Sequence, residues 1–517
     1  MMPAMSLVLY GVIALLFASI SKRVVDYLCQ PRRVSYPPGP KPKPLIGNML
    51  DLPTSYGAQE YLKWSKKYNS DILFASALGS NLLILNHPED ADELFQRRAA
   101  RYSDRPAIPI LKLLGWDPAM VSLLRYGDIF RLHRKIMQQC FHQEESRRYQ
   151  PIIQSKVNKL LLGLLETPEE FAHHNRMSGI SIPMAMMYGY SIESIHDPFI
   201  EAAEKCVQLG APLLTPGGSL INLFPILAKI PPWVPGAASQ KTAVEVRRLT
   251  ALMQNIPLNL VTKQFGEGVA PQSVIADFLE KKACVGASAE EEEAMKNIAF
   301  SIYGAAADTT ISATGTFIYQ MCINPKIQRK AQAEIESVVG SSRLPTWNDR
   351  KSLPYVEAIY REVLRWRPPL LLGIPHTSTE DDYYKGYFIP KGTAVIGNIW
   401  GMTHNDAVYS EPYEFIPERF LNEDGQLKEE DTFVYGGGKR ICVGQHIASS
   451  TVWFTMVSIL ACFSIDKAKN EIGEYIDISD DYDHFGTISF KSPYKCLITR
   501  RGPHIPDTIK EAIHNTS

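Results

Sequence analysis

One cysteine of the chain lies in a segment that is suited to binding a metal. Cys442 belongs to the segment YGGGKRICVG, residues 435–444, and a helix is predicted directly after it over 445–458. Glycines permit a tight turn and leave backbone amides free to face the sulfur, and the start of a helix adds positive potential. Both effects favour the thiolate, which is the form of cysteine that binds soft metals. A lone cysteine in a loop is more often a small buried apolar residue, so this pattern alone makes Cys442 only a candidate ligand.

A second candidate is the acid and hydroxyl pair Asp308-Thr309, in the middle of a long helical pattern. Residues 288–291 (SAEE) have the form of a capping box, and the pattern continues without proline from 294 to 322. The small residues 304–307 precede the pair and would let a large group approach the backbone, although close helix packing would also explain them. A hydroxyl beside an acid can relay protons. A threonine within a helix often only bonds its own backbone.

Composition excludes several classes of protein. The chain has 517 residues, of which 45% are hydrophobic and 21% charged, and its formal net charge is −1. These values are typical of a globular protein, and they give no reason to expect a nucleic acid as partner. The eight cysteines are scattered and form no Cys-x-x-Cys pair, so we expect a reducing compartment and neither a disulfide framework nor a zinc site.

The elements that position these residues are mostly helical. Short strand patterns occur at 72–74 and 82–85, and long helical patterns dominate after residue 128. No repeat or low-complexity linker interrupts residues 45–517. We therefore predict one large domain over 45–517, mainly α with small β-sheets.

The amino-terminal segment has the pattern of a membrane anchor. Residues 1–21 carry no charge and are rich in apolar side chains, and a basic, proline-rich hinge follows over 22–44. This arrangement predicts a single transmembrane helix with the rest of the chain in the cytosol, although a cleaved signal peptide is the alternative. A second apolar segment, 220–236, contains four prolines, so it either touches a membrane surface or packs into the core.

The segment around Cys442 resembles the haem-binding loop of cytochromes P450. Matching residues stand at Gly436, Gly438, Arg440, Cys442 and Gly444, and further signatures follow the family's order over nearly the whole chain after the anchor. The resemblance implies the cytochrome P450 fold, a single haem domain in which Cys442 is the axial ligand of haem b iron. It also implies a monooxygenase that uses dioxygen, with Thr309 and Asp308 supporting proton delivery.

The resemblance assigns roles to further residues in the same way. Arg134, His376 and Arg440 are expected to bind the haem propionates. Glu362, Arg365 and Arg419 are expected to form a buried structural network. The side chains expected to line the substrate pocket are Tyr303, Ala307, Leu370, Leu371, Leu372, Phe485 and Ile488. Because these are mostly apolar, we expect an apolar or amphipathic small molecule as substrate.

Four positions depart from the family's usual pattern. Tyr435 replaces a phenylalanine and adds a hydroxyl that needs a partner, and Phe130 replaces a tryptophan, which removes an indole hydrogen bond to a propionate. Ala306 replaces a glycine and is expected to narrow the groove beside the helix. Lys439 for arginine is a smaller change.

The resemblance also predicts partners and a location. The chain shows no dinucleotide-binding glycine motif between a strand and a helix, so electrons are expected from a separate NADPH-cytochrome P450 reductase. The chain, especially residues 384–393, resembles fungal enzymes of secondary metabolism similar to O-methylsterigmatocystin oxidoreductase, which suggests a terpenoid or other pathway intermediate as substrate. The expected location is the endoplasmic reticulum membrane. Two alternatives are a haem-thiolate isomerase or dehydratase that does not use dioxygen, and a non-catalytic haem protein.

Overall fold

A computed structural model describes residues 34–214, 217–429, 432–485 and 487–515. The predicted transmembrane segment 1–21 and the first part of the hinge lie outside these residues. Within the described part of the chain, no helix combines the length and the apolar character needed to cross a membrane.

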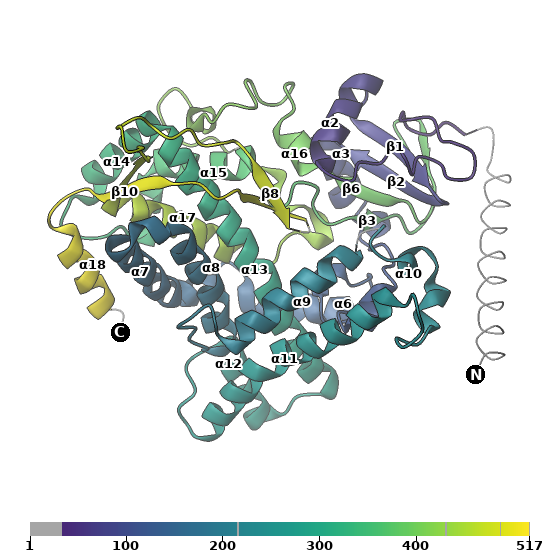
Figure 1. The fold of residues 1–517 in the computed structure, drawn as a ribbon, viewed down its shortest axis with the longest axis horizontal. Helices are drawn as coiled ribbons and strands as arrows, with labels where there is room; N and C mark the ends of the chain where they lie inside the picture. The colour runs from purple at the N-terminus through teal and green to yellow at the C-terminus, as the bar shows by residue number, and fades with distance from the viewer. Residues whose placement is uncertain (1–33, 215–216, 430–431, 486, 516–517) are drawn as a thin grey trace.

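Helices make up most of the described structure, as the sequence predicts (Figure 1). The helices of ten or more residues are α2 (Gly57–Tyr68), α6 (Asp128–Phe141), α7 (Gln150–Glu166), α8 (Phe171–Tyr188), α9 (Pro198–Leu214), α11 (Ala238–Gly266), α12 (Val274–Val285), α13 (Ala289–Ile323), α14 (Pro325–Val339), α15 (Pro354–Trp366), α17 (Gln445–Cys462) and α18 (Ile505–His514). The shorter helical segments are α3 (Pro88–Ala91), η1 (Asp92–Arg97), α4 (Ala99–Tyr102), α5 (Ile110–Leu114), η2 (Val121–Leu123), η3 (Glu145–Tyr149), η4 (Pro168–Glu170), α10 (Leu220–Leu223), η5 (Pro225–Lys229), η6 (Trp347–Ser352), α16 (Ile399–Thr403), η7 (Pro417–Phe420), η8 (Phe433–Tyr435) and η9 (Gly438–Arg440).

The strands of the described residues form four small sheets. They are β1 (Ile72–Ala77), β2 (Ser80–Leu85), β3 (His376–Thr377), β4 (Asp382–Tyr384), β5 (Tyr387–Ile389), β6 (Ala394–Gly397), β7 (Phe463–Lys467), β8 (Tyr482–Phe485), β9 (Ile488–Lys491) and β10 (Cys496–Arg500). The largest sheet has the order β1-β2-β6-β3, in which β2 and β6 are parallel. The predicted strands at 72–74 and 82–85 lie within β1 and β2, which pair as an antiparallel hairpin.

Helix α13 runs through the middle of the helical part of the molecule (Figure 1). Its capping box is present: the Ser288 hydroxyl accepts from the Glu291 amide at 3.2 Å, and the Glu291 carboxylate accepts from the Ser288 amide at 3.0 Å. The helix has 35 residues, about 52 Å at the usual rise. It packs against α6, α8, α15 and α17. Helix α13 therefore connects the elements that carry most of the candidate site.

Helix α17 follows the cysteine loop and is enclosed by protein. Nearly all of its residues from Ser450 to Cys462 are buried, including Trp453, which is fully buried. A helix that is apolar on all sides is stable only inside a core. The loop that carries Cys442 is thus attached at its carboxyl end to one of the most deeply buried helices of the protein.

The apolar segment 220–236 lies at the surface. It forms α10 and η5, and the exposed fractions of Leu220 and Trp233 are 63% and 73%. These two side chains are not packed into the core, whereas Ile221 of the same segment is buried in it.

Candidate active site

The glycines of the cysteine loop adopt the conformations that the sequence suggests. Gly436 and Gly438 have φ angles of 71° and 61°, in the left-handed region where glycine is favoured. A Cβ at Gly438 would lie 2.0 Å from the Phe95 carbonyl oxygen, so only glycine permits this close approach to η1. The Cys442 amide donates to the Tyr435 carbonyl at 2.9 Å, which closes the loop.

Cys442 has a solvent-accessible surface, although protein atoms surround its thiol closely. The residue is exposed, yet burial raises the pKa of its thiol, while the Gly444 amide and the charge of Arg134 act in the opposite direction. Both observations hold if the sulfur faces an opening within the protein body. The amide, the cation and the helix start together favour the thiolate once a metal binds.

The middle turn of α13 is open on one side. Gly304 and Ala305 are exposed, although Ile298 and Phe317 on the same helix are fully buried. Residues four positions apart lie on the same face of a helix, so Asp308 lies beside Gly304 and Thr309 beside Ala305 at this open side. The open face is therefore where a bound group can meet the acid and the hydroxyl.

Two predicted pocket residues lie on the packed side of the same helix. Tyr303 is buried, and its ring meets the Phe199 ring edge-on with the centroids 4.7 Å apart. Ala307 is also buried, facing α8 near Gly179. Ala306 is half-buried against the core rather than on the open face. The sequence indicated this turn of small residues, but only the structure shows that Gly304 and Ala305 form its open side.

Asp308 and Thr309 have different local surroundings. Burial raises the pKa of the Asp308 carboxyl; Arg176 lowers it and Glu204 raises it. Arg176 and Glu204 form an ion pair at the surface, so a charged route to solvent lies near the acid. The Thr309 hydroxyl donates to the Ala305 carbonyl at 2.7 Å and keeps its lone pairs as acceptors.

Four basic side chains gather beside the cysteine loop. Burial lowers the pKa of Arg105, with the charge of Arg440 acting in the same direction, and Arg440 in turn lies near Arg134. Burial, together with the charges of Arg105 and Arg440, lowers the pKa of His376 to about 3. The His376 ring donates from Nδ1 to the Tyr102 carbonyl at 2.6 Å. Like charges in one buried place are costly unless an anion joins them.

Some nitrogen atoms of this basic cluster lack a hydrogen-bond acceptor in the part of the chain that the structure describes. Within the described residues, Nε of Arg134 and one terminal nitrogen of Arg440 are buried without a hydrogen-bond partner, and none of Arg105, Arg134 and Arg440 forms an ion pair. A group that carries carboxylates and a soft metal would satisfy both the cluster and Cys442. The residues present thus fit a haem, whose propionates and iron need these partners.

Arg105 belongs to this cluster and was not predicted from the sequence. Its guanidinium donates to the carbonyls of Ser122, Ile374 and Pro375 at 2.9, 2.7 and 2.8 Å. These contacts join it to the strand that carries His376. The only signal in the sequence is an arginine that precedes a proline, which is too common to be specific.

Phe130, at a position where the family usually has tryptophan, contacts the basic cluster. Its ring is buried and lies 3.7 Å from the Arg440 guanidinium, a cation–π contact. Arg440 is also held by the carbonyls of Ser103 and Leu124 at 2.8 and 2.7 Å. These contacts hold the guanidinium so that its remaining nitrogen is available for an anion.

We expect Arg440→Lys to weaken haem binding by roughly tenfold to a hundredfold, because one charge-assisted hydrogen bond is worth about 1.5–3 kcal/mol. A lysine keeps the charge but lacks the planar fork that contacts both carbonyls and the propionate. The measurement is the rate at which haem passes to an excess of a haem-scavenging protein. Lys439→Leu, which changes the exposed neighbour, is the control and should retain haem as the unmodified protein does. If both variants lost haem at the same rate, Arg440 would not be a haem contact.

The predicted structural network of Glu362, Arg365 and Arg419 is present, and its Glu362–Arg365 pair is fully buried. The Arg365 guanidinium binds the Glu362 carboxylate at 2.6 and 2.8 Å, and Arg419 binds the same carboxylate at 3.2 Å. Arg365 also donates to the carbonyls of Thr403 and Pro412 at 2.9 and 2.8 Å. The network joins α15 to the segment that precedes the cysteine loop.

The remaining predicted pocket residues are only partly brought together. Leu370 and Ile488 pair as a β-bridge. Leu371 instead packs with Leu372 in the apolar cluster that includes Trp400, on the side of α2. Phe485 lies in β8, but its side chain is outside the described part of the structure.

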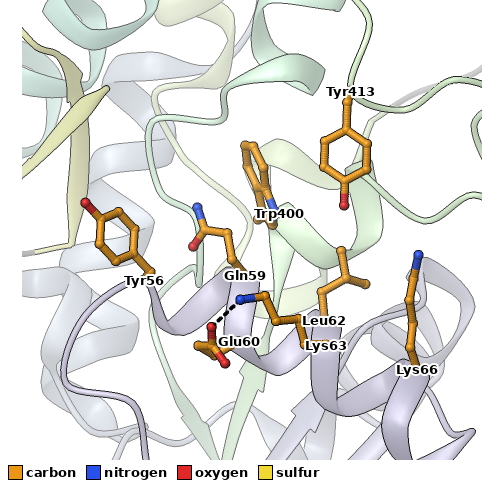
Figure 2. A pocket seen from close by; sticks show the side chains of 8 residues that line it. All are labelled: Tyr56, Gln59, Glu60, Leu62, Lys63, Lys66, Trp400 and Tyr413. Carbon is orange, nitrogen blue, oxygen red and sulfur yellow. Dashed lines mark hydrogen bonds and ion pairs between the residues drawn. The ribbon is translucent and has the colours of Figure 1, made fainter. Parts of the chain in front are cut away.

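A surface hollow of about 540 Å³ lies between α2 and the α16 region (Figure 2). Figure 2 shows Trp400 and Tyr413 across from the α2 side chains, with Lys63 bound to Glu60. The residues that line this hollow do not belong to the candidate site. We therefore assign the hollow no role in the chemistry around Cys442, although it is large.

Comparison with known proteins agrees with this geometry. The family model of cytochrome P450 matches residues 37–479. The chain belongs to the cytochrome P450 family. A cytochrome P450 monooxygenase of Armillaria gallica is 36% identical over 472 residues, which cover 90% of this chain and 92% of the relative. A cytochrome P450 monooxygenase of Coprinopsis cinerea is 37% identical over 495 residues, covering 94% and 92%.

A third relative, cytochrome P450 monooxygenase 208 of Postia placenta, is 36% identical over 491 residues, covering 94% of each chain. All three fungal relatives are named as cytochrome P450 monooxygenases. The fold and the enzyme class predicted from the sequence are therefore confirmed: this cytochrome P450 is a haem-thiolate monooxygenase.

Proposed function

We propose that this cytochrome P450 inserts one oxygen atom of dioxygen into an apolar small molecule, with electrons from an NADPH-dependent reductase. The observation that carries the proposal is the open face of α13, where Asp308 and Thr309 follow Gly304 and Ala305. When bound, the haem supplies dioxygen activation, which the cysteine thiolate promotes. Dioxygen activation needs open space beside the haem and groups that can deliver protons. The open turn of α13 supplies the space, and its acid and hydroxyl can deliver the protons.

The side chains have separate tasks in this proposal. Cys442 holds the iron, and the cluster of Arg105, Arg134, His376 and Arg440 holds the propionates and so orients the ring. Thr309 accepts a hydrogen bond from water at the open face. Burial raises the pKa of Asp308, so this carboxyl keeps its proton to higher pH than an ordinary aspartate, which suits it to donate a proton.

Apolar residues at the site support a substrate of low polarity. The bridge of Leu370 with Ile488 places two aliphatic side chains together near α13, since Ser312 of that helix binds the Ser489 carbonyl. The fungal relatives and the sequence resemblance support an intermediate of secondary metabolism, and a terpenoid is the class we propose.

We also propose that the enzyme is anchored in the endoplasmic reticulum membrane by residues 1–21, with the catalytic domain in the cytosol. The exposed Leu220 and Trp233 support contact with the same membrane surface. The reductase would dock at exposed basic residues beside the cysteine loop, Arg131, Lys135 and Lys439.

Turnover with isotopically labelled dioxygen tests the reaction class. The purified enzyme, a reductase and NADPH are incubated with a panel of terpenoids, and mass spectrometry follows the label. We expect one labelled oxygen atom in each product and no product without NADPH. Product formed without NADPH or dioxygen would instead favour an isomerase or dehydratase, and haem binding with no turnover would favour a non-catalytic haem protein.

Replacing Asp308 tests the proton route. We expect Asp308→Asn to lower the rate of product formation by roughly a hundredfold, because a positioned acid contributes about 10²–10⁴ to such steps. The carbon monoxide difference spectrum should not change, because Asp308 is not a ligand of the iron. An unchanged rate of product formation in this variant would exclude Asp308 from the proton route.

A further inference from the structure

Tyr435 holds the cysteine loop at two points. Its carbonyl accepts the Cys442 amide at 2.9 Å, and its hydroxyl lies 2.8 Å from the hydroxyl of Tyr360. The family usually has phenylalanine at this position, which has no hydroxyl to make the second contact. The sequence indicated that the added hydroxyl needs a partner, and the structure identifies Tyr360 as that partner.

Tyr360 continues the contact into the body of the protein. It lies on α15, is 5% exposed, and also forms a hydrogen bond with the Ser449 side chain of α17. Arg350 donates to the Ser449 hydroxyl at 2.9 Å and pairs with Glu357 at 2.7 Å. The hydrogen-bonded chain from Tyr435 to Glu357 thus joins the cysteine loop to α15, α17 and η6.

A second point of the cysteine loop, at Gly437 and Gly438, is held by close packing of the backbone. Gly438 lies so close to the Phe95 carbonyl that no Cβ fits, and a Cβ at Gly437 would lie 3.1 Å from the Phe433 ring. Between this contact and Cys442 are only Lys439, Arg440 and Ile441. The position of the sulfur therefore depends on the glycine contact with η1 and on the attachment of Tyr435.

We propose that the Tyr435 hydroxyl is a positioning group for the Cys442 thiolate: its bond to Tyr360 ties the cysteine loop to α15 and keeps the sulfur on the iron. The bond exists only while the loop is docked, so it slows displacement of the thiolate. This inference rests on the haem-thiolate assignment and adds a residue that the family's usual pattern does not use.

The test follows the reduced carbon monoxide complex during mild heating. In the thiolate-ligated state the complex absorbs at about 450 nm, and loss of the thiolate shifts the band to shorter wavelength. We expect Tyr435→Phe to speed this conversion about fivefold, the factor that corresponds to one net hydrogen bond. Tyr360→Phe should speed it about tenfold, because it leaves the buried Tyr435 hydroxyl without this partner.

The double variant separates a shared contact from two unrelated effects. If the two hydroxyls act through one bond, Tyr435→Phe with Tyr360→Phe converts no faster than Tyr360→Phe alone, whereas independent effects would multiply. Multiplied rates in the double variant would overturn the proposal.

Tyr319→Phe is the matched control for general loss of stability. Tyr319 is also buried, on α13, and its hydroxyl binds Asp480. This variant is expected to lower the Tm of unfolding and to convert at the wild-type rate. Conversion of Tyr435→Phe at the wild-type rate, or equal acceleration by Tyr319→Phe, overturns the positioning role alone. A wild-type protein without the thiolate band overturns the haem-thiolate assignment and this inference together.

Discussion

The Cys442→Ser variant is expected to bind haem and to lack the absorption band at about 450 nm in its reduced carbon monoxide complex. A serine hydroxyl is a hard oxygen ligand with little tendency to ionise, so it does not replace the soft thiolate. The basic cluster around Arg440 and Arg105 is unchanged in this variant and should still hold the propionates. Oxygenation of substrate should fall below detection, because the thiolate drives cleavage of the oxygen–oxygen bond.

Cys284→Ser provides the matched control for this prediction. Cys284 is an exposed cysteine of α12, outside the candidate site. Its replacement should leave the absorption band, the haem content and the turnover at wild-type values. A Cys442→Ser variant that keeps the band would show that another residue ligates the iron, and the site assigned to the cysteine loop would be wrong.

Glu362→Ala should prevent the accumulation of folded, haem-loaded protein. The change leaves the Arg365 guanidinium fully buried without its carboxylate and also removes the partner of Arg419. Breaking a buried ion pair by removing one member costs about 3–5 kcal/mol. Because the whole stability of a domain is about 5–15 kcal/mol, a large share of it would be lost.

The measurement is the Tm of unfolding together with the yield of soluble holoprotein. Glu60→Ala serves as the control, because Glu60 pairs with Lys63 at 2.6 Å on the exposed surface of α2. An exposed pair contributes about 0–1 kcal/mol, so this variant should unfold close to the wild-type temperature. Equal effects of the two substitutions would mean that the buried network does not stabilise the fold as the geometry indicates.

Local patterns predicted much of the fold because the relevant interactions are close in sequence. The capping box at Ser288 and Glu291 joins residues three positions apart, and no proline interrupts the helical pattern over 294–322. The hairpin of β1 and β2 follows from two short apolar runs joined by a tight turn. The resemblance to cytochromes P450 then supplied the fold and the haem ligand.

The sequence by itself determined the family, the long central helix, Cys442 as the candidate ligand and the Asp308-Thr309 pair, because each depends on neighbouring residues or on a motif. Only the tertiary structure decided which side of α13 is open, that Arg105 lies beside Arg440, and that Tyr360 binds Tyr435. Arg105 and Arg440 are far apart along the chain, and Tyr360 and Tyr435 lie on separate elements. Spacing cannot reveal such contacts, because they form only when the helices pack and bring distant side chains together.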